Sequence, residues 1–146
     1  MLIITRGLPG CGKSTWAKRC AMENEASGTQ TVRVNRDSLR SMLHFDLWSK
    51  ENEKLTVKAR NTLIATLLSQ KINVICDDTN LDPFVLEELT NIGRSQGHAV
   101  IVKDFTDVPL HVCIDRDSFR EGKARVGPKV ILDMHARYLD KPGSAG

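Results

Sequence analysis

The chain has 146 residues, of which 40% are hydrophobic and 27% are charged, and its formal net charge is +3. These values are typical of one soluble globular domain. No run approaches the roughly 18 apolar residues of a membrane span, and no basic region followed by a long apolar stretch opens the chain, so we expect a cytoplasmic protein without a membrane partner. The small net charge does not by itself indicate a nucleic-acid-binding protein.

Short apolar runs alternate with segments of helical periodicity. Strands are predicted over residues 2–6, 31–35, 72–76 and 99–103. Helices are predicted over residues 16–22, from about 37, over about 50–70, and over 83–97, 109–120 and 128–139. This alternation predicts an α/β fold with a central parallel sheet of about four to five strands and helices on both faces. In such sheets ligands bind beyond the carboxyl ends of the strands.

The ends of this pattern set the expected domain boundaries. Residues 1–140 are predicted to form the domain, and residues 121–127 within it a mobile connection that acts as a C-terminal lid. Residues 141–146 contain no core-forming side chain and are predicted to be a flexible tail or the stub of a linker. The four cysteines are expected to be free thiols.

Residues 7–14, Gly-Leu-Pro-Gly-Cys-Gly-Lys-Ser, fit the pattern G-x-x-x-x-G-K-[ST] of a phosphate-binding loop. Its glycines let the backbone curl and bring N–H groups to phosphate oxygens. Lys13 supplies a charge for the β- and γ-phosphates, the Ser14 hydroxyl is suited to Mg²⁺, and Thr15 opens a helix whose dipole faces the anion. We therefore expect ATP or another nucleoside triphosphate to bind Gly10, Cys11, Gly12, Lys13, Ser14 and Thr15.

A carboxylate and a guanidinium follow the second predicted strand. Asp37 and Arg40 are three residues apart, on one side of a helical turn. A kinase that acts on an alcohol needs a carboxylate to accept the hydroxyl proton, and arginine grips an anionic part of the acceptor. The alternative is that Asp37 only caps the helix and Arg40 is solvated.

Two aspartates follow the third predicted strand, in the sequence Asp77-Asp78-Thr79-Asn80. P-loop enzymes hold an acidic residue near Mg²⁺ at this position. We expect one of the two, assigned to Asp78, to reach the metal through a water molecule, while Asp77 caps the loop that leads to Pro83.

Basic residues surround the predicted lid. An arginine on a mobile lid stabilises the charge that develops on a transferred phosphoryl group. Arg120 is the best candidate, because it directly precedes a Glu-Gly pair where the lid can hinge. The alternative is that Arg116, Arg120 and Arg125 are ordinary solvated side chains.

A second set of basic residues forms a candidate path for a nucleic-acid strand, or simply a solvated helix face; it comprises Arg36, Arg40, Lys50, Lys54, Lys58 and Arg60. Phe45 and Trp48 follow Arg40 by about one and two helical turns. Either aromatic ring is suited to stacking on a base, although core packing is the commoner role. The four histidines show no metal-binding spacing.

Together these motifs resemble the kinase domain of bacteriophage-type polynucleotide kinases, which transfer the γ-phosphate of ATP to a 5′-hydroxyl end. The resemblance spans nearly the whole chain. It rests on residues 7–17, on Asn35-Arg36-Asp37 with Arg40, on Asp78-Thr79-Asn80-Leu81 before Pro83, and on Arg116 and Arg120. Many members of that family continue into a 3′-phosphatase domain, whose D-x-D-x-T signature does not occur in these 146 residues.

The resemblance implies roles for the candidate residues. Lys13 and Ser14 hold the donor phosphates and the metal, and Asp37 is the general base. Arg40 binds the phosphate next to the acceptor hydroxyl, while Asp78 and Thr79 support the phosphate-binding loop and the acceptor site. Arg120 corresponds to the lid arginine on the donor phosphate, and Arg116 is placed beside it.

The implied function is ATP- and Mg²⁺-dependent phosphorylation of the 5′-hydroxyl end of DNA or RNA, as in nucleic-acid end repair. A P-loop kinase of a small hydroxyl-bearing metabolite is the alternative, because it would share the loop, the aspartate after the third strand and the lid arginine. A nucleotide-gated switch without an acceptor is a third possibility, but the chain lacks the guanine-reading N-K-x-D motif.

Overall fold

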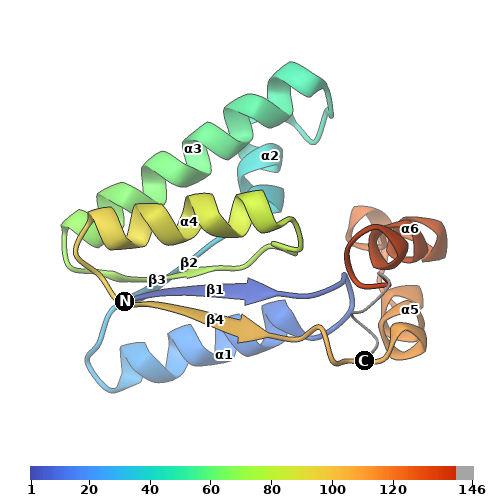
Figure 1. Cartoon of the computed structure of the whole chain (residues 1–146), viewed down its shortest axis with the longest axis horizontal. Helices are drawn as coiled ribbons and strands as arrows, with labels where there is room; N and C mark the ends of the chain where they lie inside the picture. Colours follow the sequence, from blue (N-terminus) through green and yellow to red (C-terminus); the bar gives the residue numbers. More distant parts are fainter. Residues whose placement is uncertain (141–146) are drawn as a thin grey trace.

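The computed structural model describes residues 1–140, so the predicted tail lies outside the described residues. Four parallel strands form one sheet in the order β2-β3-β1-β4 (Figure 1). They are β1 (Leu2–Arg6), β2 (Thr31–Val34), β3 (Asn73–Cys76) and β4 (Val100–Asp104). The register aligns Ile3 of β1 with Ile75 of β3 and Ile101 of β4. The predicted parallel sheet of four to five strands is confirmed.

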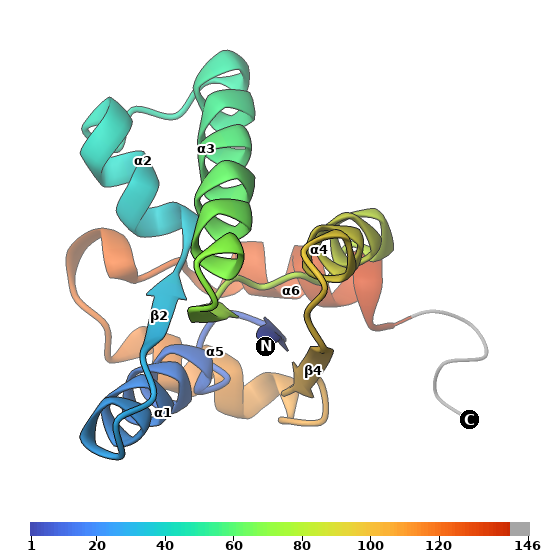
Figure 2. The ribbon, with the colours of Figure 1, turned by 90° about the vertical axis from the view of Figure 1, so that its left-hand side faces the viewer.

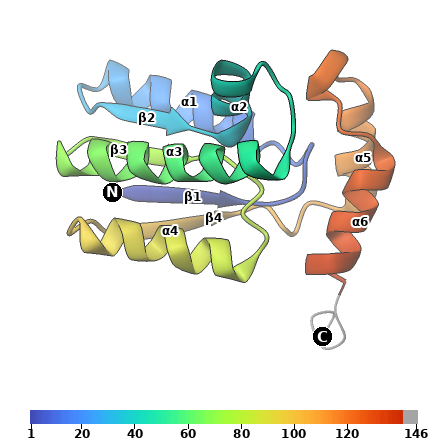
Figure 3. The same cartoon turned by 90° about the horizontal axis from the view of Figure 1, so that it is seen from above.

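Six α-helices and one 3₁₀ helix complete the described chain: α1 (Lys13–Ala26), α2 (Arg36–His44), α3 (Lys50–Ser69), α4 (Pro83–Ser95), α5 (Leu110–Ser118), η1 (Gly122–Ala124) and α6 (Pro128–Tyr138). Helices α3 and α4 lie on one face of the sheet and α1 on the other (Figures 1 and 2). Helices α5 and α6 stand beyond the carboxyl ends of the strands (Figure 3). The C-terminal helices therefore cover the edge at which ligands are expected.

The buried side chains form two separate clusters. The first joins the sheet to α2, α3 and α4 and includes Leu2, Ile4, Val34, Leu39, Ile64, Leu68, Val74, Cys76 and Leu89. The second joins the loop after β1 to α5 and α6 and includes Leu8, Cys11, Leu81, Cys113 and Ile131. The second cluster is important for the site, because it fixes the loop of residues 7–14 against the C-terminal helices. All four cysteines are free, as expected.

Local side chains begin three of the helices. Asn35 accepts a hydrogen bond from the Ser38 backbone N–H at 2.8 Å and so caps α2. Ser49 caps α3 and Asp82 caps α4, the latter with Pro83 at the first helical position. The cap predicted at Asp82 is confirmed. The alternative role of Asp37 as a cap is wrong, because Asn35 performs it.

The connection between α5 and α6 contains regular structure and a buried side-chain contact. It contains η1, and its end is held by Asp117, a 1% exposed carboxylate that accepts hydrogen bonds from the backbone N–H groups of Val126 and Gly127, both at 2.9 Å. Helix α5 ends at Ser118, so Arg120 lies in this connection rather than in the helix.

Among residues 1–140, no helix combines the length and apolar character that crossing a membrane requires.

Candidate active site

The phosphate-binding loop joins β1 to α1 and is pressed against α5. Gly10 has a φ of 83°, and a Cβ added there would lie 2.3 Å from the carbonyl oxygen of Cys113. Gly12 has a φ of 100° and immediately precedes α1. Because side chains are excluded at position 10 by both the backbone angle and the neighbouring helix, the glycine is required for the loop to approach α5. The glycine pattern therefore has a direct structural cause here.

Lys13 and Ser14 occupy the first turn of α1. The Lys13 ammonium donates to the Leu8 carbonyl at 2.8 Å and lies 3.4 Å from the Cys11 sulfur. This lysine is 7% exposed, and its ammonium group lies against the loop to which the lysine belongs. The Ser14 hydroxyl accepts a 3.5 Å hydrogen bond from Arg33 of β2. Both side chains predicted to meet phosphate and metal are thus positioned within the loop.

The two aspartates after β3 have different surroundings. Asp78 accepts from the Arg36 backbone N–H at 2.9 Å and from the Arg60 guanidinium at 3.2 Å. Both of its carboxylate oxygens are therefore engaged in anchoring α2 and α3. Asp77 pairs with Arg33 at 2.6 Å through one oxygen, and its buried Oδ1 has no hydrogen-bond partner among the described residues.

This difference concerns the metal prediction. Arg33 contacts both Asp77 and Ser14, so these two oxygen-bearing side chains share a neighbour. Within residues 1–140, no group of three or more His, Cys, Asp or Glu side chains is arranged to hold a metal ion. Mg²⁺ commonly binds through one or two protein oxygens together with substrate phosphates and water. Ser14 and the unpaired Asp77 oxygen fit that mode, and the metal role of Asp78 stays a prediction.

Asp37 and Arg40 lie together on α2, with a third partner from α3. Arg40 makes a two-point contact with Glu53, at 2.9 and 2.8 Å, and a 2.7 Å bond to Asp37. The Arg40 hydrogen bonds lower the pKa of Glu53 below its ordinary value, and Glu53 in turn raises the pKa of Arg40. The Asp37 side chain is 90% exposed. The arginine is therefore fixed by Glu53, while the carboxylate beside it remains open to a ligand.

A cleft of about 620 Å³ brings the predicted residues together. It is lined by Pro9, Lys13, Ser14, Arg36, Asp37, Arg40, Trp48, Asp77, Asp78, Thr79, Arg120, Lys123, Ala124, Val126, Val130 and Met134. A second hollow of about 430 Å³ is lined by Gly10, Gly12, Thr15, Trp16, Arg19, Arg116 and Arg120. The residues assigned to catalysis, ATP, the metal or the acceptor end all line one of the two, except Cys11 of the loop, which is buried.

The two candidate arginines differ in position. Arg116 donates to the Cys11 carbonyl at 3.4 Å and lines only the second hollow. Arg120 donates to the Ala124 carbonyl at 3.4 Å, lies 3.9 Å from Asp117, and lines both spaces. Arg120 is thus the side chain that borders both the loop and the cleft containing Asp37. The remaining candidate, Arg125, lines neither.

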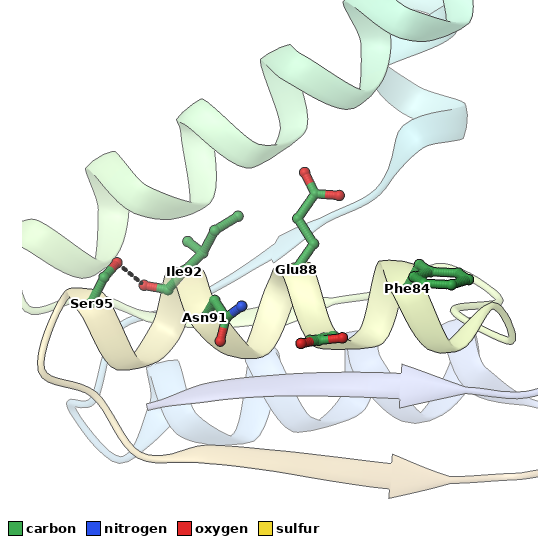
Figure 4. A pocket seen from close by; sticks show the side chains of 6 residues that line it. Phe84, Glu88, Asn91, Ile92 and Ser95 are labelled. Carbon is green, nitrogen blue, oxygen red and sulfur yellow. Dashed lines mark hydrogen bonds between the residues drawn. The ribbon is translucent and has the colours of Figure 1, made fainter.

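Another hollow, of about 500 Å³, lies along α4 (Figure 4). It is lined by Phe84, Glu87, Glu88, Asn91, Ile92 and Ser95. Two of these side chains are acidic and none is basic, so the surface is unsuited to a phosphate group. None of the predicted site residues lies there.

Comparisons with known proteins identify the family of the chain. A family model described as an AAA domain matches residues 2–141. The chain belongs to this AAA-domain family. It is 30% identical to the L-seryl-tRNA(Sec) kinase of Methanococcus maripaludis over 144 residues, which are 99% of this chain and 54% of that protein. It is 35% identical to a probable adenylyl-sulfate kinase of Pseudomonas aeruginosa, over 76% of this chain and 50% of that protein.

A solved structure adds the fold. In the structure of the Pnkp1/Rnl/Hen1 RNA repair complex, one chain matches with a TM-score of 0.79 and 30% identity, over 94% of this chain and 43% of that one. The chain therefore has the α/β fold of the P-loop kinases. It spans about half the length of the curated relatives that it matches.

Two buried or half-buried residues of the site were missed by sequence reasoning. Arg60 was assigned to an exposed basic path, but it is 1% exposed and pairs with Asp78, so this assignment is wrong. The burial of Arg60 could be predicted from its spacing. The buried residues of α3 recur every four residues, at Thr56, Arg60, Ile64 and Leu68. Glu53 carried no such signal, since its partner Arg40 lies on another helix.

Proposed function

We propose that the chain is an ATP-dependent kinase that transfers the γ-phosphate to the 5′-hydroxyl end of DNA or RNA. The supporting observation is that one cleft is lined by the loop lysine, by Asp37 with Arg40, and by Arg120. A donor phosphate at the loop and an acceptor hydroxyl at Asp37 would share this space. The coarser reading, a phosphoryl-transfer enzyme, rests on the loop and on the P-loop kinase fold.

On this proposal the residues divide into a donor set, a metal set and an acceptor set. The loop backbone and Lys13 bind the donor phosphates of ATP, and Arg116 lies over the same loop. Ser14 and the unpaired Asp77 oxygen would hold Mg²⁺, in part through water, with Asp78 anchoring the elements around them. Mg²⁺ would neutralise negative charge on the phosphates. The residues present therefore fit both ATP and the metal.

The acceptor set then supplies the chemistry. Asp37 accepts the proton of the acceptor hydroxyl as its oxygen bonds to the γ-phosphorus and the bond to the β-phosphate oxygen breaks. Arg40 retains N–H donors beyond its contacts with Glu53 and Asp37. Those donors would bind the phosphate on the 3′ side of the acceptor nucleotide, and Thr79 lines the same cleft. Arg120 would stabilise charge on the transferred group.

The printed names of the relatives bear on the acceptor. They include a kinase of seryl-tRNA, kinases of adenylyl-sulfate and a chain of an RNA repair complex. Each name contains an RNA or an adenylyl group, which favours a nucleotide-bearing acceptor over a sugar or another simple metabolite. Adenylyl-sulfate is the specific alternative, because two further adenylyl-sulfate kinases match at 29% and 30% identity.

The test is phosphate transfer from labelled ATP with Mg²⁺ to a panel of acceptors. The panel contains a 5′-hydroxyl oligonucleotide, the same oligonucleotide with a 5′-phosphate, a nucleoside with and without a 3′-phosphate, adenylyl-sulfate and seryl-tRNA. We expect transfer to the 5′-hydroxyl ends and to the nucleoside 3′-phosphate, and poor transfer to the plain nucleoside. Transfer to adenylyl-sulfate or seryl-tRNA alone would replace the proposed acceptor, and ATP turnover without any acceptor would favour a switch.

Three variants accompany the panel. Lys13→Ala or Ser14→Ala should abolish transfer with the fold intact, because both side chains act on phosphate and metal. Asp37→Asn keeps the shape of the side chain and removes the proton acceptor, so ATP should still bind while transfer falls by about 10²- to 10⁴-fold. Normal transfer by Asp37→Asn would place the general base elsewhere.

A further inference from the structure

Trp48 lies where three hollows meet. It lines the 620 Å³ cleft, a hollow of about 490 Å³ next to Asp46 and Lys123, and a hollow of about 350 Å³ along α3. The side chain is 70% exposed, so the predicted alternative of core packing does not apply to it. An exposed indole at the exit of a polar cleft offers a flat surface on which a base can stack.

The third hollow leads from Trp48 onto a row of lysines. Its lining residues are Trp48, Lys50, Glu53, Lys54 and Val57. The carboxylate of Glu53 is already paired with Arg40 and Arg36, so its charge is balanced. The two lysines in this hollow are exposed and have no hydrogen bond or ion pair with any described residue. The hollow therefore presents positive charge together with apolar surface.

This row continues along the helix. Lys50, Lys54 and Lys58 are all exposed and recur every four residues, so they lie on one side of α3, the long helix seen along its length in Figure 2. Neighbouring members are separated by about 6 Å along the helix axis. That interval suits successive phosphates of an extended strand. Arg36, Arg40 and Arg60, the other members of the predicted basic path, are instead held by carboxylates.

We propose that a single-stranded acceptor leaves the cleft over Trp48, stacks a base on its indole, and places the following phosphates along Lys50, Lys54 and Lys58. This proposal rests on the proposed function and adds the path of the strand. A single strand fits better than a duplex, because a stacked aromatic ring needs an unpaired base. An anionic membrane is the competing ligand for lysines beside an indole. The strand is favoured because Trp48 also lines the cleft that contains Asp37 and Arg40.

The test is binding of 3′-fluorescein-labelled, 5′-hydroxyl oligothymidylates, measured by fluorescence anisotropy without turnover. The wild type should bind a strand of about ten nucleotides more tightly than a dinucleotide, since the longer strand reaches the lysines. Trp48→Ala should weaken binding of both by about tenfold or more, and Trp48→Phe should restore most of it. If Trp48 had only a structural role, oligonucleotide affinity would not depend on whether position 48 carries an aromatic ring.

The lysines are tested by charge reversal with a matched control. Lys50→Glu with Lys54→Glu should remove the advantage of the longer strand, and the slope of log affinity against log salt should fall by about 1.4. Lys18→Glu with Lys71→Glu makes the same change of charge on other exposed lysines and should keep that advantage. Equal behaviour of the two double variants, or a wild-type affinity independent of length, would overturn the strand path.

Transfer assays on the same proteins separate the two proposals. If binding depends on strand length, Trp48 and the lysines, but no 5′-hydroxyl end is phosphorylated, the strand path is retained and the proposed acceptor is rejected. Transfer to 5′-hydroxyl ends that is indifferent to Trp48→Ala would reject the path and retain the acceptor. Binding to vesicles of anionic lipid, with no binding to oligothymidylate, would assign the surface to a membrane and reject the path.

Discussion

The two sides of the cleft are built from different parts of the chain. On the proposed function, the donor side is backbone: the loop is formed by glycines, is pressed against α5 at Cys113, and holds Lys13 through the Leu8 carbonyl. The acceptor side consists of side chains, because Arg40 of α2 is fixed by Glu53 of α3. The donor side depends on eight consecutive residues, whereas the acceptor side depends on the way two helices pack.

This difference has consequences for mutation. A backbone site tolerates changes around it as long as the loop keeps its glycines and its support from α5 and α6. A site of paired side chains is sensitive to partners that never touch a ligand, of which Glu53 and Arg60 are examples. Substitutions between the two sides should therefore lower the rate of phosphate transfer. Substitutions within the acceptor side should instead change stability or acceptor binding.

The largest effect is expected at Arg120, which borders both sides. Arg120→Ala should lower kcat by about 10³- to 10⁵-fold, the range found for an arginine that stabilises a transferred phosphoryl group. Arg120→Lys should restore little, since lysine lacks the planar fork. The measurement is steady-state transfer at saturating ATP and acceptor.

Arg125→Ala is the matched control, because Arg125 belongs to the same connection but lines neither hollow. It should stay close to the wild type. A loss of activity in Arg125→Ala or Arg116→Ala, with Arg120→Ala active, would move the role to another arginine.

The next effect concerns stability on the acceptor side. Arg60→Met removes one partner of the buried pair with Asp78 and should lower the free energy of unfolding by about 3 to 5 kcal/mol. Urea denaturation measures this difference. Arg94→Met on α4, an exposed position, is the control and should change stability by less than about 0.5 kcal/mol. Equal stability of the two variants would mean that the pair does not hold α3 to the sheet.

Glu53→Gln should produce a smaller effect, on acceptor binding. The neutral amide cannot accept the two-point contact as strongly, so Arg40 loses its fixed orientation and the KM for a nucleoside 3′-phosphate should rise by about tenfold. The KM for ATP should hardly change. A matched Glu51→Gln variant alters a neighbouring exposed carboxylate and should leave both constants unchanged.

The same variant has a predicted pH signature. The pKa of Glu53 is lower in the folded chain than its ordinary value, so its ionisation stabilises the fold above that ordinary value of about 4.3. This contribution is lost as the pH falls below about 4.3 and through the folded pKa. Glu53→Gln should therefore show a weaker fall in stability with acid than the wild type. An identical acid profile would indicate that the pair with Arg40 does not form in solution.

The fold and the conformation of the phosphate-binding loop could be predicted from the sequence, for a physical reason. Strand, loop and helix signals are local, and the positive φ angles of Gly10 and Gly12 follow from residue type. The cleft residues after β2 and β3 were also predicted, because parallel strands end at a common edge. The partners of Arg40 and Asp78 were not, since they depend on how α3 packs. Nothing in the spacing of Glu53 marks it as the residue that holds Arg40.

The smallest effect concerns the turn that presents Trp48. Phe45 directly follows α2 with a φ of 53° and is 84% exposed, so a large side chain occupies a left-handed conformation with little packing in return. Phe45→Gly relieves a strain of about 1–2 kcal/mol but frees the unfolded chain by about 0.4–1 kcal/mol. The net gain should raise Tm by about 2–4 °C in calorimetry. Asp46→Gly, at a φ of 64°, relieves less strain, because aspartate tolerates this conformation, and it loses the contact with Lys123, so its gain should be smaller. If the KM for an oligonucleotide is unchanged in Phe45→Gly, only Trp48 of this turn is left as a candidate for stacking. If the KM rises together with the Tm, the strained phenylalanine also contacts the acceptor.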